Sequence, residues 1–273
     1  MRVLVKVGGA QLEEAQARGE LVRSVALAQA TGLEVVLVHG GGNQIRSLVR
    51  RLGLPEAYHE GLRVTDAATA EIVLQVLAGL VGKTLAAAFE KHGVRAVSLC
   101  GADGSTFSAI PERREGIELG FVGAVDHVHP RLVGHLLAQD YLPLIATVAP
   151  GPDGCFYNVN ADMAAGPLAR ALDAEALLFL TDVPGVLDAE GRLIPVLSPE
   201  HCTELRQSGV IRGGMIPKVE AALAAVAENP DSLVKIVPAA GENAVLSALD
   251  PGVGTRFTAA VTALEEAWTS TSF

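Results

Sequence analysis

The chain is short of aromatic residues and cysteines, and each shortage narrows the class of protein. Phe, Trp and Tyr make up only 4% of its 273 residues, so Val, Leu, Ile and Ala must build the core. The three cysteines, Cys100, Cys155 and Cys202, are odd in number and widely spaced. They fit neither a disulfide framework nor a zinc site, which indicates reduced thiols and a cytoplasmic protein.

Positive charge is also scarce. Lys and Arg number 21 against 31 Asp and Glu, a formal net charge of −10. A general nucleic-acid binder needs a cationic face, and so does a protein held to anionic lipids by charge. The longest apolar runs, such as Ala176–Leu180, are far shorter than the ~20 residues that span a bilayer. The first residues are typical of a strand rather than of a signal peptide. We therefore expect neither nucleic-acid nor membrane partners.

What the chain does contain is a regular alternation of two patterns. Short β-branched runs cover Val3–Val7, Val35–His39, Ala96–Cys100, Leu142–Val148, Ala176–Thr181 and Leu233–Val237. Helical patterns cover Leu12–Thr31, Asn43–Leu52, Asp66–His92, Asp126–Gln139, Ala161–Leu172 and Met215–Ala227. The strand runs are continuous rather than alternating, as in strands buried on both faces. The order predicts an α/β fold with a mainly parallel sheet and helices on both sides.

No linker divides the chain, so we predict a single domain over residues 1–273. A faint seam at Ala171–Glu175 would separate an N-lobe of about residues 1–172 from a C-lobe of about residues 173–273, with the sheet continuing through it. The stretch Ser105–Val125 breaks the strand and helix rhythm and reads as a hairpin, either a lid or a surface decoration. The tail from Ala260 looks frayed.

The first strand carries a lysine, Lys6, directly before Gly8 and Gly9. A buried ammonium is costly unless a counter-charge or a ligand pairs with it. The adjacent glycines allow backbone N–H groups to approach a phosphate closely. We therefore favour an anion site over the alternative, a lysine whose stem reaches past the edge of the sheet.

A second glycine cluster follows the second strand. His39-Gly40-Gly41-Gly42-Asn43 joins a buried strand to a helix start, where free amides and the helix dipole attract anions. The spacing matches neither the dinucleotide fingerprint nor a Walker loop. A tight turn without a ligand remains the alternative.

Polar residues gather at other helix starts and strand ends. Arg63 precedes a helix start and could grip a carboxylate with its planar fork, unless it is simply a surface arginine. Asn158, Asn160 and Asp162 converge where another helix begins, although Asn160 could simply cap it. Lys218 lies near a helix N-terminus, where the dipole disfavours a cation, and a bound anion would explain it.

In this order and spacing, the motifs resemble the amino-acid kinase family, and within it most closely the acetylglutamate kinases. The residues that carry the resemblance are Lys6-Val7-Gly8-Gly9, His39-Gly40-Gly41-Gly42, Gly61-Leu62-Arg63-Val64-Thr65, Asn158-Val159-Asn160-Ala161-Asp162, Thr181-Asp182-Val183-Pro184-Gly185 and Gly213-Gly214-Met215-Ile216-Pro217-Lys218. The resemblance implies a three-layer αβα sandwich and transfer of the ATP γ-phosphoryl to the side-chain carboxylate of N-acetyl-L-glutamate, in arginine biosynthesis.

The resemblance also implies roles for particular residues. Lys6 and Lys218 would stabilise the transferring phosphoryl, and Asp162 would hold both lysines. The substrate-binding residues would be Gly41, Gly42, Arg63, Asn158 and Asn160. The nucleotide-binding residues would be Gly8, Gly9, Asp182, Val183, Pro184, Gly185, Val186, Leu187, Val210, Ile211 and Arg212.

Because a carboxylate is already ionised at pH 7, such an acceptor needs no general base. The resemblance implies ATP as co-substrate, with Mg²⁺ bound through its phosphates and no metal site of the protein's own. It further implies a homodimer without arginine feedback, since Lys6 lies too near the start for the family's extra N-terminal helix. The alternatives are a kinase for carrier-linked aminoadipate or glutamate in lysine biosynthesis, and a non-catalytic amino-acid sensor on the same fold.

Overall fold

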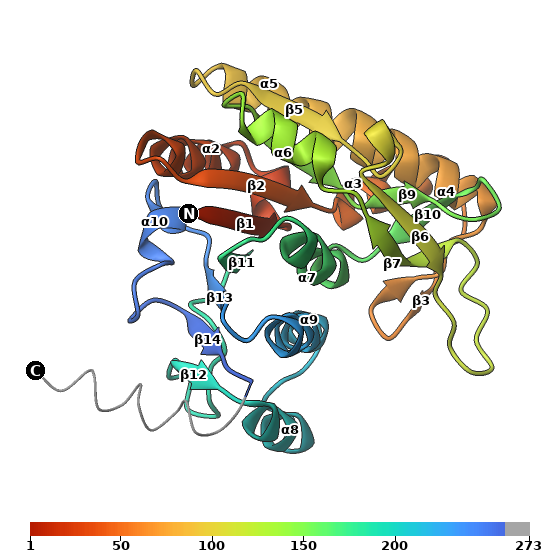
Figure 1. Ribbon diagram of the computed structural model, residues 1–273. Coiled ribbons are helices and arrows are strands. Elements are labelled where there is room, and N and C mark those ends of the chain that lie inside the picture. Colours follow the sequence, from red (N-terminus) through yellow and green to blue (C-terminus); the bar gives the residue numbers. More distant parts are fainter. Residues whose placement is uncertain (260–273) are drawn as a thin grey trace, which may run out of the picture.

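An eight-stranded sheet runs through the computed structural model, which describes residues 1–259 (Figure 1). The strand order is β12-β14-β13-β11-β1-β2-β8-β5. The bounds are β1 Arg2–Val7, β2 Glu34–His39, β5 Ala96–Leu99, β8 Leu142–Ala146, β11 Ala176–Thr181, β12 Val196–Leu197, β13 Leu233–Pro238 and β14 Thr255–Phe257. Every neighbouring pair is parallel except β13 and β14. The mainly parallel sheet predicted from the sequence is confirmed; the expected frayed tail from Ala260 lies outside the described residues.

Helices cover both faces of this sheet, which gives three layers (Figure 1). One face packs against α1 Ala10–Glu13, α2 Ala15–Ala30, α3 Gly42–Arg51, α4 Ala67–Leu74, η1 Gln75–Val81, α5 Gly82–Glu90 and α10 Ala244–Ser247. The other face packs against α6 Arg131–Leu137, α7 Ala161–Ala171, α8 Pro199–Gln207 and α9 Met215–Glu228. Each face has its own apolar core of mostly aliphatic side chains, as the low aromatic content requires.

Strand β1 decides where its lysine points. Successive side chains of a strand point to opposite faces. Val3 and Val5 belong to the core under α2, whereas Leu4 belongs to the core under α7 and α9. Lys6 follows the parity of Leu4, so its side chain lies on the face of the sheet that carries α7 and α9.

The sheet continues across the predicted seam. β1 is hydrogen-bonded to β2 on one side and to β11 on the other, so strands from before and after residue 173 share one hydrogen-bond network. The two lobes of the sequence-based interpretation are therefore built on one common sheet.

A second, four-stranded sheet lies beside the first, in the order β6-β7-β10-β9. Its strands are β6 Phe107–Pro111, β7 Val122–Val128, β9 Val148–Pro150 and β10 Phe156–Val159; η2 Asp103–Ser105 precedes them, and the separate hairpin β3 Tyr58–His59 and β4 Leu62–Arg63 completes the fold. β6 and β7 are antiparallel, which confirms the predicted hairpin.

This sheet corrects two sequence-based predictions. The expected helix over Asp126–Gln139 begins only at Arg131, because residues up to Val128 extend β7. The expected strand Leu142–Val148 is divided between β8 and β9, which belong to different sheets. Apolar runs alone could not reveal either break, since buried strands and buried helices share that composition.

The stretch Ala67–Glu90 is one continuous helix of 24 residues, formed by α4, η1 and α5. By length and composition alone it could cross a membrane. A core helix meets the same test, and here Val73, Leu77, Leu85 and Phe89 are buried against the sheet. Its middle, η1, is a π-helix, a local widening that often occurs at functional sites.

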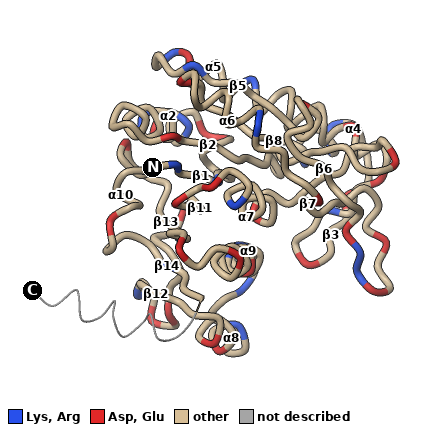
Figure 2. Tube along the Cα trace, viewed as in Figure 1, with Lys and Arg blue, Asp and Glu red and all other residues tan. Residues whose placement is uncertain are grey.

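Charged residues are spread over loops and outer helices, with both signs interspersed (Figure 2). The excess of acidic residues therefore forms no single acidic face in this view. Such a distribution supports solubility and leaves the sign of a local site to its own few residues.

Candidate active site

Three side chains from three distant segments meet at the carboxyl end of β1. The Lys6 Nζ lies 2.7 Å from Asp162 Oδ1. The Lys218 Nζ lies 3.0 Å from Oδ1 and 2.9 Å from Oδ2 of the same carboxylate. Asp162 comes from the first turn of α7 and Lys218 from the first turn of α9. The carboxylate thus bridges two ammonium groups, and the trio carries a net charge of +1 when all three ionise.

Burial makes this trio unusual. The side chains of Lys6 and Asp162 are 7% and 9% exposed, and that of Lys218 is 19% exposed. Burial lowers the pKa of Lys6 to about 8; Asp162 opposes that effect and Lys218 adds to it. Burial alone would raise the pKa of Asp162, but the two lysines outweigh it and hold that pKa below its usual range. The carboxylate is therefore ionised at neutral pH and favours the charged form of Lys6.

The two predicted glycine loops border the trio. Gly9 has a φ of +55°, a left-handed conformation that residues with a Cβ rarely adopt. A Cβ on Gly41 would lie 2.8 Å from Leu77 Cδ2 and 3.1 Å from Val81 Cγ2 in the π-helix, so a side chain at Gly41 would require these side chains to move. No side chain caps the N-terminus of α3, which leaves backbone N–H groups there for a ligand.

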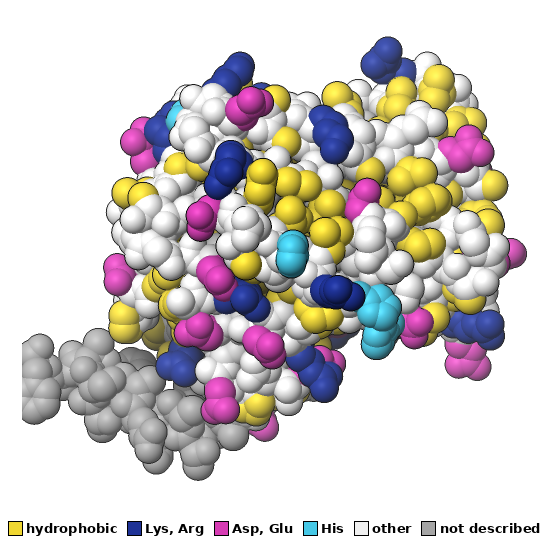
Figure 3. Space-filling view, turned by 45° about the horizontal axis from the view of Figure 1, so that its top comes forward, with side chains coloured by type: hydrophobic (Ala, Val, Ile, Leu, Met, Phe, Trp, Pro, Cys, Tyr) yellow, Lys and Arg dark blue, Asp and Glu magenta, His cyan; other side chains and the backbone are white. Residues whose placement is uncertain are grey.

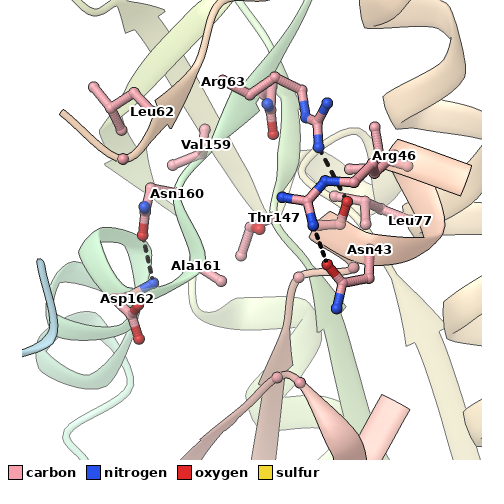
Figure 4. A pocket seen from close by; sticks show the side chains of 18 of the residues that line it. Asn43, Arg46, Leu62, Arg63, Leu77, Thr147, Val159, Asn160, Ala161 and Asp162 are labelled. Atoms are coloured by element: carbon pink, nitrogen blue, oxygen red, sulfur yellow. Dashed lines mark hydrogen bonds between the residues drawn. The ribbon is translucent and has the colours of Figure 1, made fainter. Parts of the chain in front are cut away.

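A cavity of about 280 Å³ joins these parts and is lined at one end by Lys6 and Asp162 and at the other by Arg63 (Figure 4). Arg63 is 6% exposed, and its guanidinium donates to Glu56 Oε2 at 2.7 Å and to the Gly42 carbonyl at 3.1 Å. It is therefore a fixed cation inside the cavity and not a surface arginine.

The two asparagines play different parts in this cavity. Asn160 caps α7, because its Oδ1 accepts from the backbone N–H groups of Asp162 and Met163. Asn158 donates to Thr65 Oγ1 at 3.3 Å, a long bond that leaves most of its amide available. Capping therefore accounts for Asn160, which also lines the cavity, whereas Asn158 retains the hydrogen-bonding capacity that a ligand needs.

A larger cleft of about 1360 Å³ opens on the other side of the trio and is lined by residues of α7, α9 and the loop after β11. Of the predicted nucleotide residues, Asp182 and Val183 line it, together with Gly213 and Gly214, which the prediction omitted. The structure does not bring the whole predicted set to the cleft wall; Gly8 and Gly9 line the smaller cavity, and Pro184, Gly185, Val186, Leu187, Val210, Ile211 and Arg212 line neither. Val186 and Ile211 are buried in the core.

His39, in the glycine-rich motif, is structural. It is fully buried, and its Nδ1 contacts the Gly40 carbonyl at 2.9 Å. Burial lowers its pKa to about 4, so the ring is neutral at pH 7 and Nδ1–H donates to that carbonyl. The imidazole thus supports the turn into the glycine loop and does not act as a charged ligand.

Sequence reasoning missed three residues of this site: Arg46, Glu56 and Tyr58. Arg46 and Tyr58 line the cavity, and Glu56 accepts from Arg63. One signal could have found Arg46, since Asn43 and Arg46 are spaced i, i+3 in the first turns of α3 and share a helix face. Tyr58 lies in the short hairpin and Glu56 lies just before it, and the hairpin is too short to show a periodic sequence pattern.

Comparison with known proteins bears directly on this geometry. The family model described as the amino acid kinase family matches residues 1–235. The chain belongs to the amino acid kinase family. The family predicted from the motifs is therefore confirmed, and the residues described above can be considered as those of a phosphotransferase.

Curated relatives from several bacteria are acetylglutamate kinases. The protein from Acidiphilium cryptum is 44% identical over 234 residues, which cover 82% of this chain and 78% of that protein. The one from Methylobacterium nodulans is 41% identical over 265 residues, 93% of this chain and 87% of that protein. Kosmotoga olearia has a relative 38% identical over 254 residues, 92% and 89% of the two chains.

Solved structures agree on the fold. The structure of smu.665 from Streptococcus mutans has a TM-score of 0.80 at 29% identity and covers 95% of this chain and 99% of that one. An N-acetylglutamate synthase from Neisseria gonorrhoeae has a TM-score of 0.80 at 23% identity, covering 95% of this chain and 60% of that one. The αβα architecture predicted from the sequence is confirmed by these neighbours and by the sheet itself.

Proposed function

We propose that this amino acid kinase transfers the γ-phosphoryl of ATP to the side-chain carboxylate of N-acetyl-L-glutamate, in the cytoplasm, as a step of arginine biosynthesis. The observation that carries the proposal is the cavity with cations at both ends, Lys6 at one and Arg63 at the other, together with Lys218, which pairs with Asp162 from the side of the larger cleft. A dicarboxylate is the acceptor that such a cavity suits. The acetylglutamate kinases among the relatives support the same acceptor.

The chemistry follows from the charges. A carboxylate oxygen of the acceptor forms a bond to the γ-phosphorus while the bond from that phosphorus to the bridging oxygen of ADP breaks. Since the attacking group is already an anion, the difficulty is to bring two anions together, and catalysis consists of positioning and charge neutralisation. Lys6 and Lys218 supply the positive charge, and Asp162 fixes both at one point.

The backbone adds further donors. The glycines after β1 and at the start of α3 line the cavity in which the phosphoryl group would move, so their backbone N–H groups are candidate donors to it. Gly9 and Gly41 permit this close approach, one by its conformation and the other by its lack of a side chain. Arg63 and Asn158 would bind the carboxylate at the far end of the acceptor, which sets its distance from the lysines.

Mg²⁺ fits this site as a companion of ATP. Among the described residues, no group of three or more His, Cys, Asp or Glu side chains could hold a metal ion. Both oxygens of Asp162 are occupied by lysines. These residues fit an ion that is held by the nucleotide phosphates and would neutralise part of the phosphate charge. The larger cleft beside Asp182 and Gly213 would bind the nucleotide.

The proposal predicts a specific pattern of products. With ATP and Mg²⁺, the purified chain should form an acyl phosphate from N-acetyl-L-glutamate, trapped by hydroxylamine as a hydroxamate. Glutamate, aspartate and N-acetylaminoadipate should give at most about one tenth of that kcat/KM, since a misplaced or uncharged contact costs about tenfold or more. A product from N-acetylaminoadipate alone would favour the carrier-linked alternative, and no product from any acceptor would favour the sensor.

A homodimer is the second part of the proposal. β5 is an edge strand of the large sheet, and its residues Ala96–Ser98 are only half-buried. Turning the part of the molecule that carries α5, β5 and α6 forward shows apolar side chains gathered across the middle of that face (Figure 3). An open edge beside apolar surface favours pairing with a second copy.

Size-exclusion chromatography with light scattering should therefore give about twice the mass of the chain. The value should be constant over a tenfold dilution in the micromolar range. A monomer or a hexamer at those concentrations would contradict the proposed dimer.

A further inference from the structure

We propose that Arg46 is a second specificity-determining cation of the acceptor cavity, which binds the α-carboxylate of the acceptor together with Arg63. This inference rests on the proposed function and identifies a residue of that site which the motif resemblance did not include.

Arg46 is placed in the cavity by the first turns of α3. It lines the same cavity as Arg63, and its guanidinium lies among the labelled side chains between Arg63 and Asn43 (Figure 4). Its side chain is 40% exposed, so a ligand in the cavity can reach it. The start of α3 is also the anion-binding end of that helix, which favours a negatively charged partner there.

Three contacts hold the Arg46 guanidinium in place. Its Nη1 donates to Asn43 Oδ1 at 3.0 Å, and its Nη2 lies 3.3 Å from Tyr58 Oη. Its Nε lies 3.4 Å from Glu56 Oε1. A flexible side chain held at all three nitrogens loses less freedom when a ligand binds, which favours binding.

The two arginines share the same supports. The guanidinium carbons of Arg46 and Arg63 lie 5.7 Å and 4.7 Å from the centre of the Tyr58 ring. Glu56 contacts both arginines and also Arg50, at 3.7 Å. One carboxylate cannot neutralise both guanidinium groups that line the cavity, so Arg46, Arg63 and Glu56 together keep one positive charge at this end.

Hydrogen-bonding capacity remains as well. A guanidinium has five N–H donors. Arg46 uses three in the contacts above and Arg63 uses two, counted over the described residues. The remaining donors on two neighbouring guanidinium groups match the several lone pairs of a carboxylate better than those of an amide, which carries hydrogens of its own.

The test compares two acceptors that differ only at that group, N-acetyl-L-glutamate and its α-carboxamide. With Arg46→Gln, kcat/KM for the acid should fall about 10- to 50-fold, whereas kcat/KM for the α-amide should fall less than about threefold. KM for ATP should not change. Arg46→Lys keeps the charge but lacks the planar, bidentate guanidinium. The ratio of kcat/KM for the acid to kcat/KM for the amide should therefore lie between the ratios of the unmodified chain and Arg46→Gln.

Arg50→Gln is the matched control, because Arg50 contacts the same glutamate but is 71% exposed and does not line the cavity. Arg50→Gln should leave kcat/KM unchanged for both acceptors. Equal losses on acid and amide in Arg46→Gln would assign Arg46 a structural role, and no loss on the acid would remove it from the site; both overturn the inference. Failure of the proposed function is separate, since it would appear in the unmodified chain as no turnover of the acid.

Discussion

Replacing Lys6 or Lys218 with alanine is expected to lower kcat by about 10²- to 10³-fold, the range found when a preorganised hydrogen-bond donor to the transition state is removed. The KM for the acceptor should change less than about fivefold. Both ammonium groups lie within 3.0 Å of Asp162 at the end of the cavity away from Arg63. In the proposed reaction they would therefore contact the moving phosphoryl group rather than the part of the acceptor that determines binding. Steady-state kinetics over both substrates would measure the two effects separately.

Lys83→Ala is the control for this experiment, because Lys83 is an exposed lysine whose Nζ contacts only the Ser98 carbonyl at 3.3 Å among the described residues. Its kcat and KM should be those of the unmodified chain. A rise in KM with kcat preserved in Lys6→Ala and Lys218→Ala would show that the lysines bind the ground state, and the transition-state role would be wrong.

Asp162→Asn is expected to have the largest combined effect on activity and stability. The substitution keeps the shape of the side chain and removes the one negative charge between two ammonium groups. Breaking a buried ion pair by neutralising one partner costs about 3–5 kcal/mol of folding free energy. We expect a lower thermal unfolding temperature and a loss of kcat of about 10²-fold or more at pH 8, because Lys6 would lose its proton there.

The lowered pKa of Lys6 determines the direction in which activity and stability should change with pH in Asp162→Asn. Burial already lowers the pKa of Lys6 from its ordinary 10.5 to about 8, against the attraction of Asp162. Without that attraction, the folded-state pKa falls further. Because the pKa of Lys6 is lower in the folded chain than in the unfolded chain, protonation of Lys6 reduces the free energy of unfolding. This loss of stability is complete below the folded-state pKa and disappears as the pH rises to 10.5. The alkaline limb of kcat/KM should therefore move from about pH 8 to a lower pH, and the stability gap between variant and unmodified chain should widen as the pH falls below about 8.

Asp188→Asn tests whether the loss of any ion-paired carboxylate would lower activity and shift its pH profile. Asp188 pairs with Arg192 at 2.8 Å, and the arginine is 73% exposed. Neither residue lines the cavity or the larger cleft, and the arginine is solvent-exposed, so activity and its pH profile should stay unchanged. An alkaline limb in Asp162→Asn that coincides with the unmodified one would contradict the electrostatic coupling between Asp162 and Lys6.

Much of the site could be predicted because it lies where regular elements end. Lys6 stands in a run whose apolar neighbours require a buried strand, so its charge demanded a partner. The glycines after β1 and β2 and the polar start of α7 mark the same edge of a parallel sheet, where ligands bind in open α/β folds. These features are local, and local pattern is what a sequence reveals.

Sequence patterns indicated less where the outcome depends on neighbours rather than on local pattern. The cation near the start of α9 was expected to indicate a bound anion; the structure adds that Asp162 of α7 pairs with this cation, as the resemblance implied. Val186 and Ile211 belong to predicted nucleotide loops, yet their side chains fill the core, so only backbone groups at these positions could face a ligand. Composition cannot distinguish a buried loop residue from one that lines a cleft.

The sequence by itself determined the fold class, the family and the charged residues at the centre of the site, because strand parity, glycine loops and helix starts are encoded within a few residues. Tertiary structure decided the pairings. Lys6, Asp162 and Lys218 are separated by more than fifty residues at each step and meet only when β1, α7 and α9 pack on one face of the sheet. The Glu56 bridge between Arg46 and Arg63 was likewise invisible, since a short hairpin has no periodicity and its position is set by what it contacts. Electrostatic energy depends on distance and burial, and neither quantity exists until the chain has folded.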